Sequence, residues 1–553
     1  MESKSITIGI SNGWKLSVPE GITFAEIEKS SGMEFKYPPL AARENNELRT
    51  LSEEAHDGCN VSFIDGRCEE GRRIYRYSMV FMMLKAFYKL FPNASITVDH
   101  SVTGGVWCTP NIGETFRSSH MNQLKEEMIA LSEQNIPFNS SKVKVSEAIE
   151  IFKKQGNHSD TLRLFECFDN TDEIIELYDC GGYVDYMLTR SVPHTGYLKV
   201  FDLLYYPPGF ILRFPRPKNP LVLSEFNMER QIFKKYSEFK QLGKAIQVSD
   251  VADLNASVVA KETQDIVRVS EAIQEKKLAE IADMIYRQKD NIKVILIAGP
   301  SSSGKTTFAG RLGIQLRING MKPVAISVDD YFVDREHTPR DENGEYDFEV
   351  LEALDLNLFN EHLEKLLAGE EIELPRFDFA QGKRFPSGKK LKLQPNQPVV
   401  IEGLHGLNDR LTESVARENK FKIYISPLTS LNLDNHNRIH TTDTRIIRRI
   451  VRDKLYRGRD ALGTLKKWDS VRRGERLYIF PFQEEADVMF NSFLVYEISV
   501  LRNFVEEPLK NISNEHPEYS EAQRLLKLLQ FFRPIGTEDI PQNSIIREFI
   551  GKA

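Results

Sequence analysis

The chain has 553 residues, 41% hydrophobic and 28% charged, a balance typical of soluble globular proteins with large cores. Such a length predicts roughly three or four domains. The net charge of -7 excludes a polybasic protein that coats nucleic acid, although a local basic groove stays open. No apolar run is long enough for a membrane span, and the start of the chain lacks a signal-peptide pattern, so we expect no membrane partner.

The cysteines bear on the compartment. There are five, an odd number at scattered positions, which favours reduced thiols over a disulfide framework. We therefore expect a cytoplasmic protein. All five precede residue 288, which indicates different origins for the two halves of the chain: Cys59, Cys68, Cys108, Cys167 and Cys180.

The first half has an α+β pattern. Residues 1–66 form short alternating runs with a hairpin signal at Asn12-Gly13, followed by a short helix in "TFAEIEKSSG". Residues 67–245 begin with the apolar-periodic helix "RIYRYSMVFMMLKAFYKLFP" and include a hairpin around residues 207–209. From about residue 218 the chain turns polar and helix-rich, and we interpret residues 246–287 as a helical connector.

The pattern changes in residues 288–553. Short apolar runs alternate with amphipathic helices, which predicts an α/β fold with a parallel sheet covered on both faces. The runs are "KVILIAG", "PVAISVDD", "PVVIEG", "FKIYIS" and "ADVMFNS".

A phosphate-binding loop follows the first of these runs. "GPSSSGKT", from Gly299 to Thr306, fits G-x-x-x-x-G-K-[ST], with a strand pattern before it and a helix pattern after it. The glycines would let backbone N–H groups approach phosphate oxygens, and the helix would direct its positive end at them. Lys305 would reach the β- and γ-phosphates, and the Thr306 hydroxyl would hold Mg²⁺. The alternative is a chance glycine- and serine-rich turn.

Two later strands end in acids. Asp329 and Asp330 follow "AISV", and Glu402 ends "PVVI". Carboxyl ends of parallel strands face the ligand crevice, where a carboxylate can accept a hydroxyl proton or bind Mg²⁺. The alternatives are a turn or helix cap for the aspartates and a solvated strand end for Glu402.

A basic helix comes next. In "TRIIRRIVRDKLYRGRD", four arginines recur at helical spacing and two more follow in a glycine-containing turn. Guanidinium groups suit phosphate oxygens, so we favour a lid over the phosphate site. A solvated face or an RNA-contacting face stays open. The six are Arg445, Arg448, Arg449, Arg452, Arg457 and Arg459.

Taken together, "GPSSSGKTT", "SVDDYF", "VVIEGLHG" and "RRIVRD...RGRD" resemble the uridine kinase and phosphoribulokinase family over residues 290–510. The resemblance implies ATP- and Mg²⁺-dependent phosphorylation of a small-molecule hydroxyl, most directly the 5′-hydroxyl of a nucleoside. Asp329 would be the general base and, with Thr306 and Glu402, a metal neighbour. Lys305, Arg449 and Arg452 would act on the transferring phosphoryl group. ATP would contact Gly299, Ser301, Ser302, Ser303, Gly304, Lys305, Thr306, Thr307 and Arg459.

The acceptor side departs from this family. The resemblance assigns Asp347 to the ribose hydroxyls and adds three residues of "PRFDFAQGKR" to the substrate site, namely Phe377, Asp378 and Arg384. Phe377 replaces a tyrosine, and Gly382 stands where the family has a histidine. Phe377 can stack on a base but cannot donate a hydrogen bond. A sugar phosphate or another small alcohol therefore stays open as acceptor.

Residues 1–245 resemble the N-terminal part of threonyl-tRNA synthetases: a TGS-type β-grasp module, then the second additional, editing-type domain. The metal-ligand positions of that domain read Tyr77, Phe81, Cys180 and Val184 here, and one thiolate does not make a zinc site. We predict no metal and no editing hydrolysis in this half, and core packing for Tyr77, Phe81 and Val184.

The role of this half stays open between binding RNA, a small effector or another subunit, and a homo-oligomer is compatible with all three. A rival to the kinase hypothesis is an RNA-associated regulator in which the nucleotide site is a switch.

Overall fold

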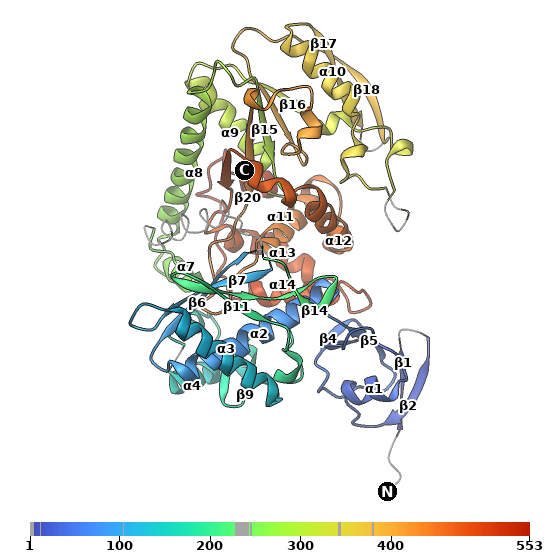
Figure 1. Ribbon diagram of the computed structural model, residues 1–553, viewed down its shortest axis with the longest axis vertical. Helices are drawn as coiled ribbons and strands as arrows, with labels where there is room; N and C mark the ends of the chain where they lie inside the picture. Colours follow the sequence, from blue (N-terminus) through green and yellow to red (C-terminus); the bar gives the residue numbers. More distant parts are fainter. Residues whose placement is uncertain are drawn as a thin grey trace.

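The computed structural model describes residues 5–10, 13–102, 104–156, 158–226, 243, 246–340, 344, 346–378 and 381–552. Asn12 of the predicted hairpin turn lies outside them, as do residues 227–242 of the predicted polar stretch. Figure 1 shows the first half of the chain at one end of the molecule and the second half at the other. Within the described residues, no helix combines the length and hydropathy needed to cross a membrane.

The N-terminal unit is a five-stranded sheet in the order β2-β1-β5-β3-β4, with β1 parallel to β5. The predicted hairpin is confirmed, since β1 and β2 are antiparallel. The short helix α1 is confirmed as well, and Thr23 and Glu26 form a capping box at its start. The elements are β1 (Ser5–Ile10), β2 (Lys15–Pro19), α1 (Phe24–Ser30), β3 (Ala41–Glu44), β4 (Glu47–Arg49) and β5 (Asn60–Ile64).

The next unit has two sheets, β11-β12-β7-β6 and β10-β9-β8, packed with helices. The predicted long helix is α2, and the predicted second hairpin is β11 with β12. The helices are α2 (Glu69–Leu90), α3 (Ser118–Glu133), α4 (Val145–Gln155) and α5 (Ser159–Glu166). The strands are β6 (Ser95–Val102), β7 (Gly105–Asn111), β8 (Asn139–Lys144), β9 (Ile174–Cys180), β10 (Tyr183–Tyr186), β11 (Asp202–Tyr206), β12 (Gly209–Arg213), β13 (Pro215–Arg216) and β14 (Asn219–Leu223).

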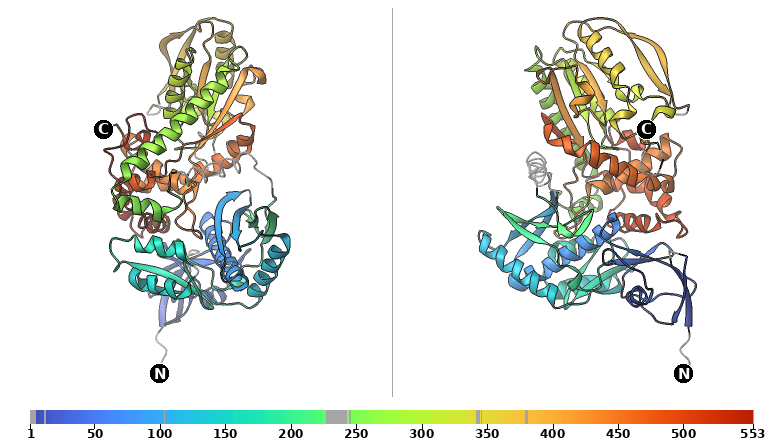
Figure 2. Two further views of the ribbon diagram at one scale, coloured as in Figure 1. Left: turned by 90° about the vertical axis from the view of Figure 1, so that its left-hand side faces the viewer. Right: turned by 45° about the vertical axis from the view of Figure 1, so that its right-hand side comes forward.

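The predicted connector contains α7 (Val251–Val259) and α8 (Thr263–Tyr286). Helix α8 packs along α9 of the second half, as the left view of Figure 2 shows. Arg311 of α9 donates to Glu275 at 2.7 Å, and Tyr496 donates to Glu271 at 2.8 Å. Helix α8 of this connector is therefore also one wall of the second half.

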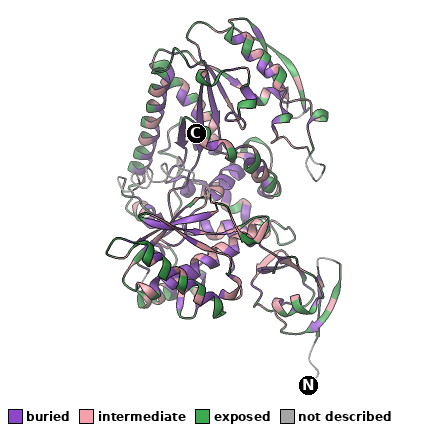
Figure 3. Ribbon diagram, viewed as in Figure 1, coloured by how far each residue is buried: buried purple, intermediate pink, exposed green. Residues whose placement is uncertain are grey.

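The predicted parallel sheet is confirmed. Its order is β16-β19-β15-β20-β21, every neighbouring pair is parallel, and each strand is one of the predicted apolar runs. Figure 3 shows β15, β19, β20 and β21 as largely buried, whereas the edge strand β16 is only partly buried. The strands are β15 (Val294–Ala298), β16 (Val324–Ser327), β19 (Val399–Gly403), β20 (Lys420–Ser426) and β21 (Val488–Asn491), with a separate hairpin of β17 (Ile372–Asp378) and β18 (Lys383–Leu391). The helices are α9 (Lys305–Ile318), α10 (Leu356–Leu367), α11 (Thr441–Tyr456), α12 (Ala461–Tyr478), α13 (Glu497–Lys510), α14 (Tyr519–Leu529) and α15 (Arg547–Ile550).

The two halves meet through the segment between β20 and α11, residues 427–440, which we call the docking loop. The backbone N–H of Val98 on β6 donates to Asn435 at 2.7 Å, and Thr161 donates to Asp434 at 2.8 Å. Asn432 returns a hydrogen bond to the Val98 carbonyl at 3.2 Å. These bonds attach the loop to a strand edge and a helix start of the first half.

Candidate functional site

The phosphate loop joins β15 to α9. A Cβ on Gly299 would collide with the carbonyl oxygen of Ile425 on β20, so only glycine fits there. Gly304 has a φ of +87° and faces Ile545, whose methyl carbon would lie 2.6 Å from an added Cβ. The predicted loop serines Ser302 and Ser303 are buried beneath it. Backbone and close neighbours together hold the curvature that a phosphate cradle requires.

Buried ion pairs support the loop from behind. Arg445 donates through Nε to the Ser301 carbonyl at 2.9 Å and pairs with Glu475, which also accepts from the Ser301 N–H at 3.2 Å. Arg448 pairs with Glu497 at 2.6 Å, and neither side chain is exposed. The solvated-face alternative is thus wrong for Arg445 and Arg448, and they hold the loop rather than cover it.

The carboxyl edge of the sheet brings the predicted metal neighbours together. The Thr306 hydroxyl donates to Glu402 at 2.9 Å, which joins the start of α9 to the end of β19. Lys305 bends back to donate to the loop carbonyl of Gly299 at 3.0 Å. Asp329 lies in a 3₁₀ turn directly after β16, the strand adjacent to β19.

Burial shifts the pKa values of the charged side chains at this edge. Burial raises the pKa of Glu402 and of Asp329 above their ordinary values, while the charge of Lys305 opposes the rise. The charge of Asp329 raises the pKa of Glu402 further. Burial lowers the pKa of Lys305, although both acids favour its charged form. Such a mix of one cation and several acids is characteristic of functional sites.

A buried acid organises the predicted lid arginines. The Asp453 carboxylate is fully buried and lies at N–O distances between 2.9 and 3.8 Å from four guanidinium groups, those of Arg449, Arg452, Arg457 and Arg459. Arg449 also donates to the Ser301 hydroxyl at 2.6 Å, which ties this group to the phosphate loop. Sequence reasoning missed Asp453, because an acid between arginines of a helix usually indicates only surface pairing.

The C-terminal segment contributes an acid that sequence reasoning also missed. Glu548 of α15 accepts a hydrogen bond from the backbone N–H of Thr307 at 3.0 Å. This N–H belongs to the first turn of α9, where a helix presents free donors to anions. The Glu548 carboxylate therefore occupies a donor that the sequence assigned to ATP.

The acceptor side contains one predicted acid and one new acid. Asp347 accepts from the N–H of Glu349 at 3.0 Å and lies 3.7 Å from Arg473 of α12. Burial raises the pKa of Glu349, which also feels the charges of Arg449, Asp347 and Lys305. Glu349 stands in "YDFEVLEA", the stretch that departs from the family pattern.

The β17–β18 hairpin differs from what the resemblance implied. Phe377 is 5% exposed and packs against Phe332, so its ring is part of the core and not a free stacking surface. Arg384 pairs with Asp355 at 2.9 Å. Asp378 accepts from the Gln381 N–H at 3.0 Å within the turn.

The structure also explains the missing histidine. Gly382 has a φ of +69°, and an added Cβ would lie 2.7 Å from Nε of Arg335. The Arg335 N–H donates to the Gly382 carbonyl at 2.8 Å, so the two residues are fixed to each other. A guanidinium group therefore fills the space beyond position 382.

In the first half, the four editing-type positions do not gather a ligand set. Phe81 is buried against Tyr183, as predicted for core packing, and Val184 is half-buried. Tyr77 is also half-buried but lines a cavity, so core packing describes it only in part. Burial raises the pKa of Cys180 to about 12, which keeps its thiol protonated.

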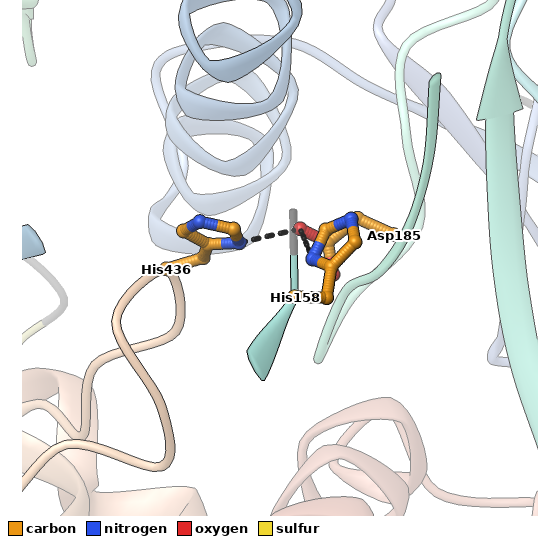
Figure 4. Close-up of side chains that lie close together, drawn as sticks. All are labelled: His158, Asp185 and His436. Carbon is orange, nitrogen blue, oxygen red and sulfur yellow. Dashed lines mark hydrogen bonds and ion pairs between the residues drawn. The ribbon is translucent and has the colours of Figure 1, made fainter. Parts of the chain in front are cut away.

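A different cluster lies where the docking loop enters the first half. Figure 4 shows His158 and His436 on either side of the Asp185 carboxylate, with one ligand atom of each within 4.8 Å of the others. His436 bonds to Asp185 at 2.9 Å and to Tyr88 at 2.8 Å. Sequence reasoning missed it because the residues are far apart along the chain.

The hydrogen bonds of this cluster favour a role in attaching the docking loop to the first half over a role in binding a metal. The Gln155 amide is oriented by the N–H and carbonyl of Val184, at 2.9 and 3.0 Å, and so donates to Nε2 of His158. Neutral His158 then carries its proton on Nδ1, facing Asp185. Burial lowers the pKa of His158 to about 4, which keeps it neutral.

The parallel sheet, the phosphate loop and the acids at its carboxyl edge define a P-loop kinase-type domain. Residues 294–499 match the model of the Phosphoribulokinase / Uridine kinase family.

Individual relatives divide the chain in the same way. A uridine kinase of Chloroflexus aurantiacus is 28% identical over 198 residues, which cover 36% of this chain and 85% of the relative. A threonine–tRNA ligase of Symbiobacterium thermophilum is 25% identical over 202 residues, 36% of this chain but only 31% of the ligase, and its similarity agrees with an editing-like first half. A solved structure described as a possible uridine kinase from Bacillus stearothermophilus is 21% identical, with a TM-score of 0.25 over 39% of this chain and 99% of that one.

Proposed function

We propose that the second half of the chain is a kinase that transfers the γ-phosphate of ATP to a hydroxyl of a small molecule, most directly the 5′-hydroxyl of a nucleoside. The observation that carries this proposal is the convergence of Lys305, the Thr306–Glu402 pair and Asp329 at one sheet edge. The similarity to proteins described as uridine kinases supports the choice of acceptor.

The residues at this edge fit Mg²⁺. They offer a hydroxyl and two carboxylates, the oxygen ligands that this hard cation prefers. Thr306 and Glu402 already share a hydrogen bond. The raised pKa values of Glu402 and Asp329 mean that their ionised forms are disfavoured, and a nearby cation would stabilise those forms. Bound there, Mg²⁺ would neutralise charge on the phosphate oxygens.

Two acids compete for the role of general base. Asp329 follows β16 and stands beside Lys305, as the family resemblance requires. Glu349 is near enough to feel both residues, and burial raises its pKa. A base must ionise and reach the hydroxyl. Burial raises the pKa of both acids, but the Asp329 side chain keeps more solvent contact than that of half-buried Glu349 and directly follows the strand end, so we assign the role to Asp329.

A second acceptor class has one observation in its favour. Arg335 occupies the space beyond Gly382, where uridine kinases place a histidine that reads the base. A guanidinium group suits an anionic acceptor such as a sugar phosphate better than a neutral pyrimidine.

The test is ADP release from ATP and Mg²⁺ with uridine, cytidine, ribulose 5-phosphate and pantothenate, using Lys305→Ala as the blank. Turnover with a nucleoside supports the first acceptor class, and turnover with ribulose 5-phosphate supports the second. Asp329→Asn should abolish turnover, whereas Glu349→Gln should retain most of it. Protein that binds ATP but phosphorylates none of the four would overturn the small-molecule kinase proposal.

A further inference from the structure

A cavity of about 470 Å³ lies between the two halves of the molecule. One side is formed by α2, β6 and β7 of the first half. The other is formed by the docking loop, α11 and α12, which face them in Figures 1 and 2. The volume is in the range of pockets that hold small molecules.

The lining of this cavity is strongly basic. One carboxylate, Glu69, takes part, and it pairs with Arg72 at 2.6 Å outside the lining. Guanidinium groups therefore dominate the charged part of the cavity wall, although the net charge of the protein is -7. Six arginines line it: Arg73, Arg76, Arg438, Arg445, Arg472 and Arg476.

Two of the lining arginines have no ion-pair partner, and one lining hydroxyl has no hydrogen-bond partner, among the described residues. Among the described residues, no carboxylate lies within ion-pair distance of Arg76 or Arg476, whereas Arg73 pairs with Glu521 at 2.7 Å. The buried hydroxyl of Tyr77 makes no hydrogen bond with a described residue. Burial and neighbouring arginines lower the pKa of Arg76, as expected where cations gather without enough anions.

Part of the remaining wall is apolar. Val98 and Val106 of the first half and Leu428 of the docking loop line it together with Phe214. The Arg76 guanidinium lies 5.6 Å from the Phe214 ring centroid, so charged and aromatic surfaces are adjacent. A ligand with an anionic group and an apolar or planar body would match both.

The cavity wall is connected directly to the phosphate loop. Arg445 lines the cavity and donates to the Ser301 carbonyl at 2.9 Å. Its ion-pair partner Glu475 accepts from the Ser301 N–H at 3.2 Å and lies 3.6 Å from Arg472, another lining residue. An anion that draws Arg445 or Arg472 toward the cavity would weaken their pairing with Glu475 and so alter how Ser301 is held.

We propose that this cavity binds a phosphorylated organic molecule of mononucleotide size, and that its binding changes the affinity of the phosphate loop for ATP. Arginine suits phosphate oxygens through paired N–H donors. A small ligand is favoured over RNA because the arginines line a cavity of limited volume between two domains. The coupling rests on the proposed function, since it takes ATP as the ligand of the loop, but occupation of the cavity does not.

Isothermal titration calorimetry tests occupation with three probes: uridine 5′-monophosphate, ribose 5-phosphate and pyrophosphate. We expect uridine 5′-monophosphate or ribose 5-phosphate to bind, and binding to fall at least tenfold in Arg76→Gln and in Arg476→Gln, because each loses a charged donor without leaving an acid unpaired. Arg268→Gln, an exposed arginine on α8, is the charge-matched control.

The phosphate loop and acceptor site must be excluded as the binding place. Binding that persists in Lys305→Ala and in Asp347→Asn supports the cavity. Binding that disappears in either of them, or persists in both cavity variants, overturns it, as does preference for a short single-stranded RNA over all three probes.

Coupling is measured by titrating ATP into protein saturated with the bound probe. A several-fold change in ATP affinity in the wild type, absent in Arg76→Gln, is the expected result. An unchanged ATP affinity would overturn the coupling even where the cavity is occupied. If the protein phosphorylates no acceptor, the proposed function fails, but both binding measurements still test the cavity and the coupling.

Discussion

The buried pair of Arg448 and Glu497 allows a quantitative test of how the phosphate loop is supported. Arg448 donates through Nε and NH2 to the two carboxylate oxygens at 2.9 and 2.6 Å. It also donates to the Ser492 carbonyl at 2.8 Å and to the Ser302 carbonyl at 3.3 Å. Both charged side chains have no exposed surface, so removing one leaves the other uncompensated.

The magnitude follows from that burial. Breaking a buried pair by removing one partner costs about 3–5 kcal/mol, whereas replacing both by apolar groups is often close to neutral. We expect Arg448→Met and Glu497→Leu each to lower the free energy of unfolding by about 3–5 kcal/mol. The double variant should lose only about 2–3 kcal/mol, mainly for two carbonyls left without a donor.

Urea unfolding monitored by Trp468 on α12 reports on this half, once Trp14 and Trp107 are replaced by phenylalanine in every variant. A double variant as unstable as the sum of the single variants would refute the reasoning. ATP binding provides the second readout. Because Arg448 holds the Ser302 carbonyl of the loop, the double variant should regain stability but still bind ATP more weakly. Wild-type ATP affinity in it would show that the loop does not depend on Arg448.

Three further predictions concern single residues. Burial lowers the pKa of His405 to about 4, so between pH 6.5 and about 4 the unfolded chain binds a proton at this residue that the folded protein does not. This residue should therefore lower stability on acidification by about 1 kcal/mol per pH unit, and His405→Phe should reduce the slope of stability against pH by that amount in urea titrations at several pH values, leaving the contribution of other buried histidines such as His158. Glu548→Gln should lower the KM for ATP several-fold, since the carboxylate no longer competes for the Thr307 N–H; an unchanged or higher KM would contradict that competition. Glu402→Gln should raise the Mg²⁺ concentration needed for half-maximal activity at least tenfold, with Glu485→Gln, an acid near Lys422, as control.

Local patterns were sufficient to predict the sheet and the loop. Each buried strand reads as an apolar run, because a parallel strand covered on both faces has no polar side. Close backbone approach requires glycine at position 299, and a positive φ favours it at position 304, so the motif itself predicts the shape of the loop. The supporting acids could not be found in this way: Glu475 is 174 residues from Ser301, and Glu548 is 241 residues from Thr307.

The arginine helix shows the limit of periodicity. Spacing places Arg445, Arg448, Arg449 and Arg452 on one stripe of α11, and the stripe exists. The acid partners divide it, because Arg445 and Arg448 pair with buried glutamates while Arg449 and Arg452 share Asp453. Arginines at the same helical spacing thus support the phosphate loop in one case and gather around Asp453 as predicted lid residues in the other. The difference depends on acids from α12, α13 and α11 itself.

Helix α12 explains why a cavity between the domains should affect catalysis at all. Successive residues of a helix point about 100° apart, so neighbours on α12 can face different sites. Arg472 lines the cavity, whereas Arg473 lies 3.7 Å from Asp347 on the acceptor side and Glu475 holds Ser301 of the phosphate loop. A rotation or shift of this helix would change the cavity, the acceptor side and the loop together. The synthetase-like half forms the second wall of the cavity. A ligand bound there would act on the acceptor side and the phosphate loop through α12.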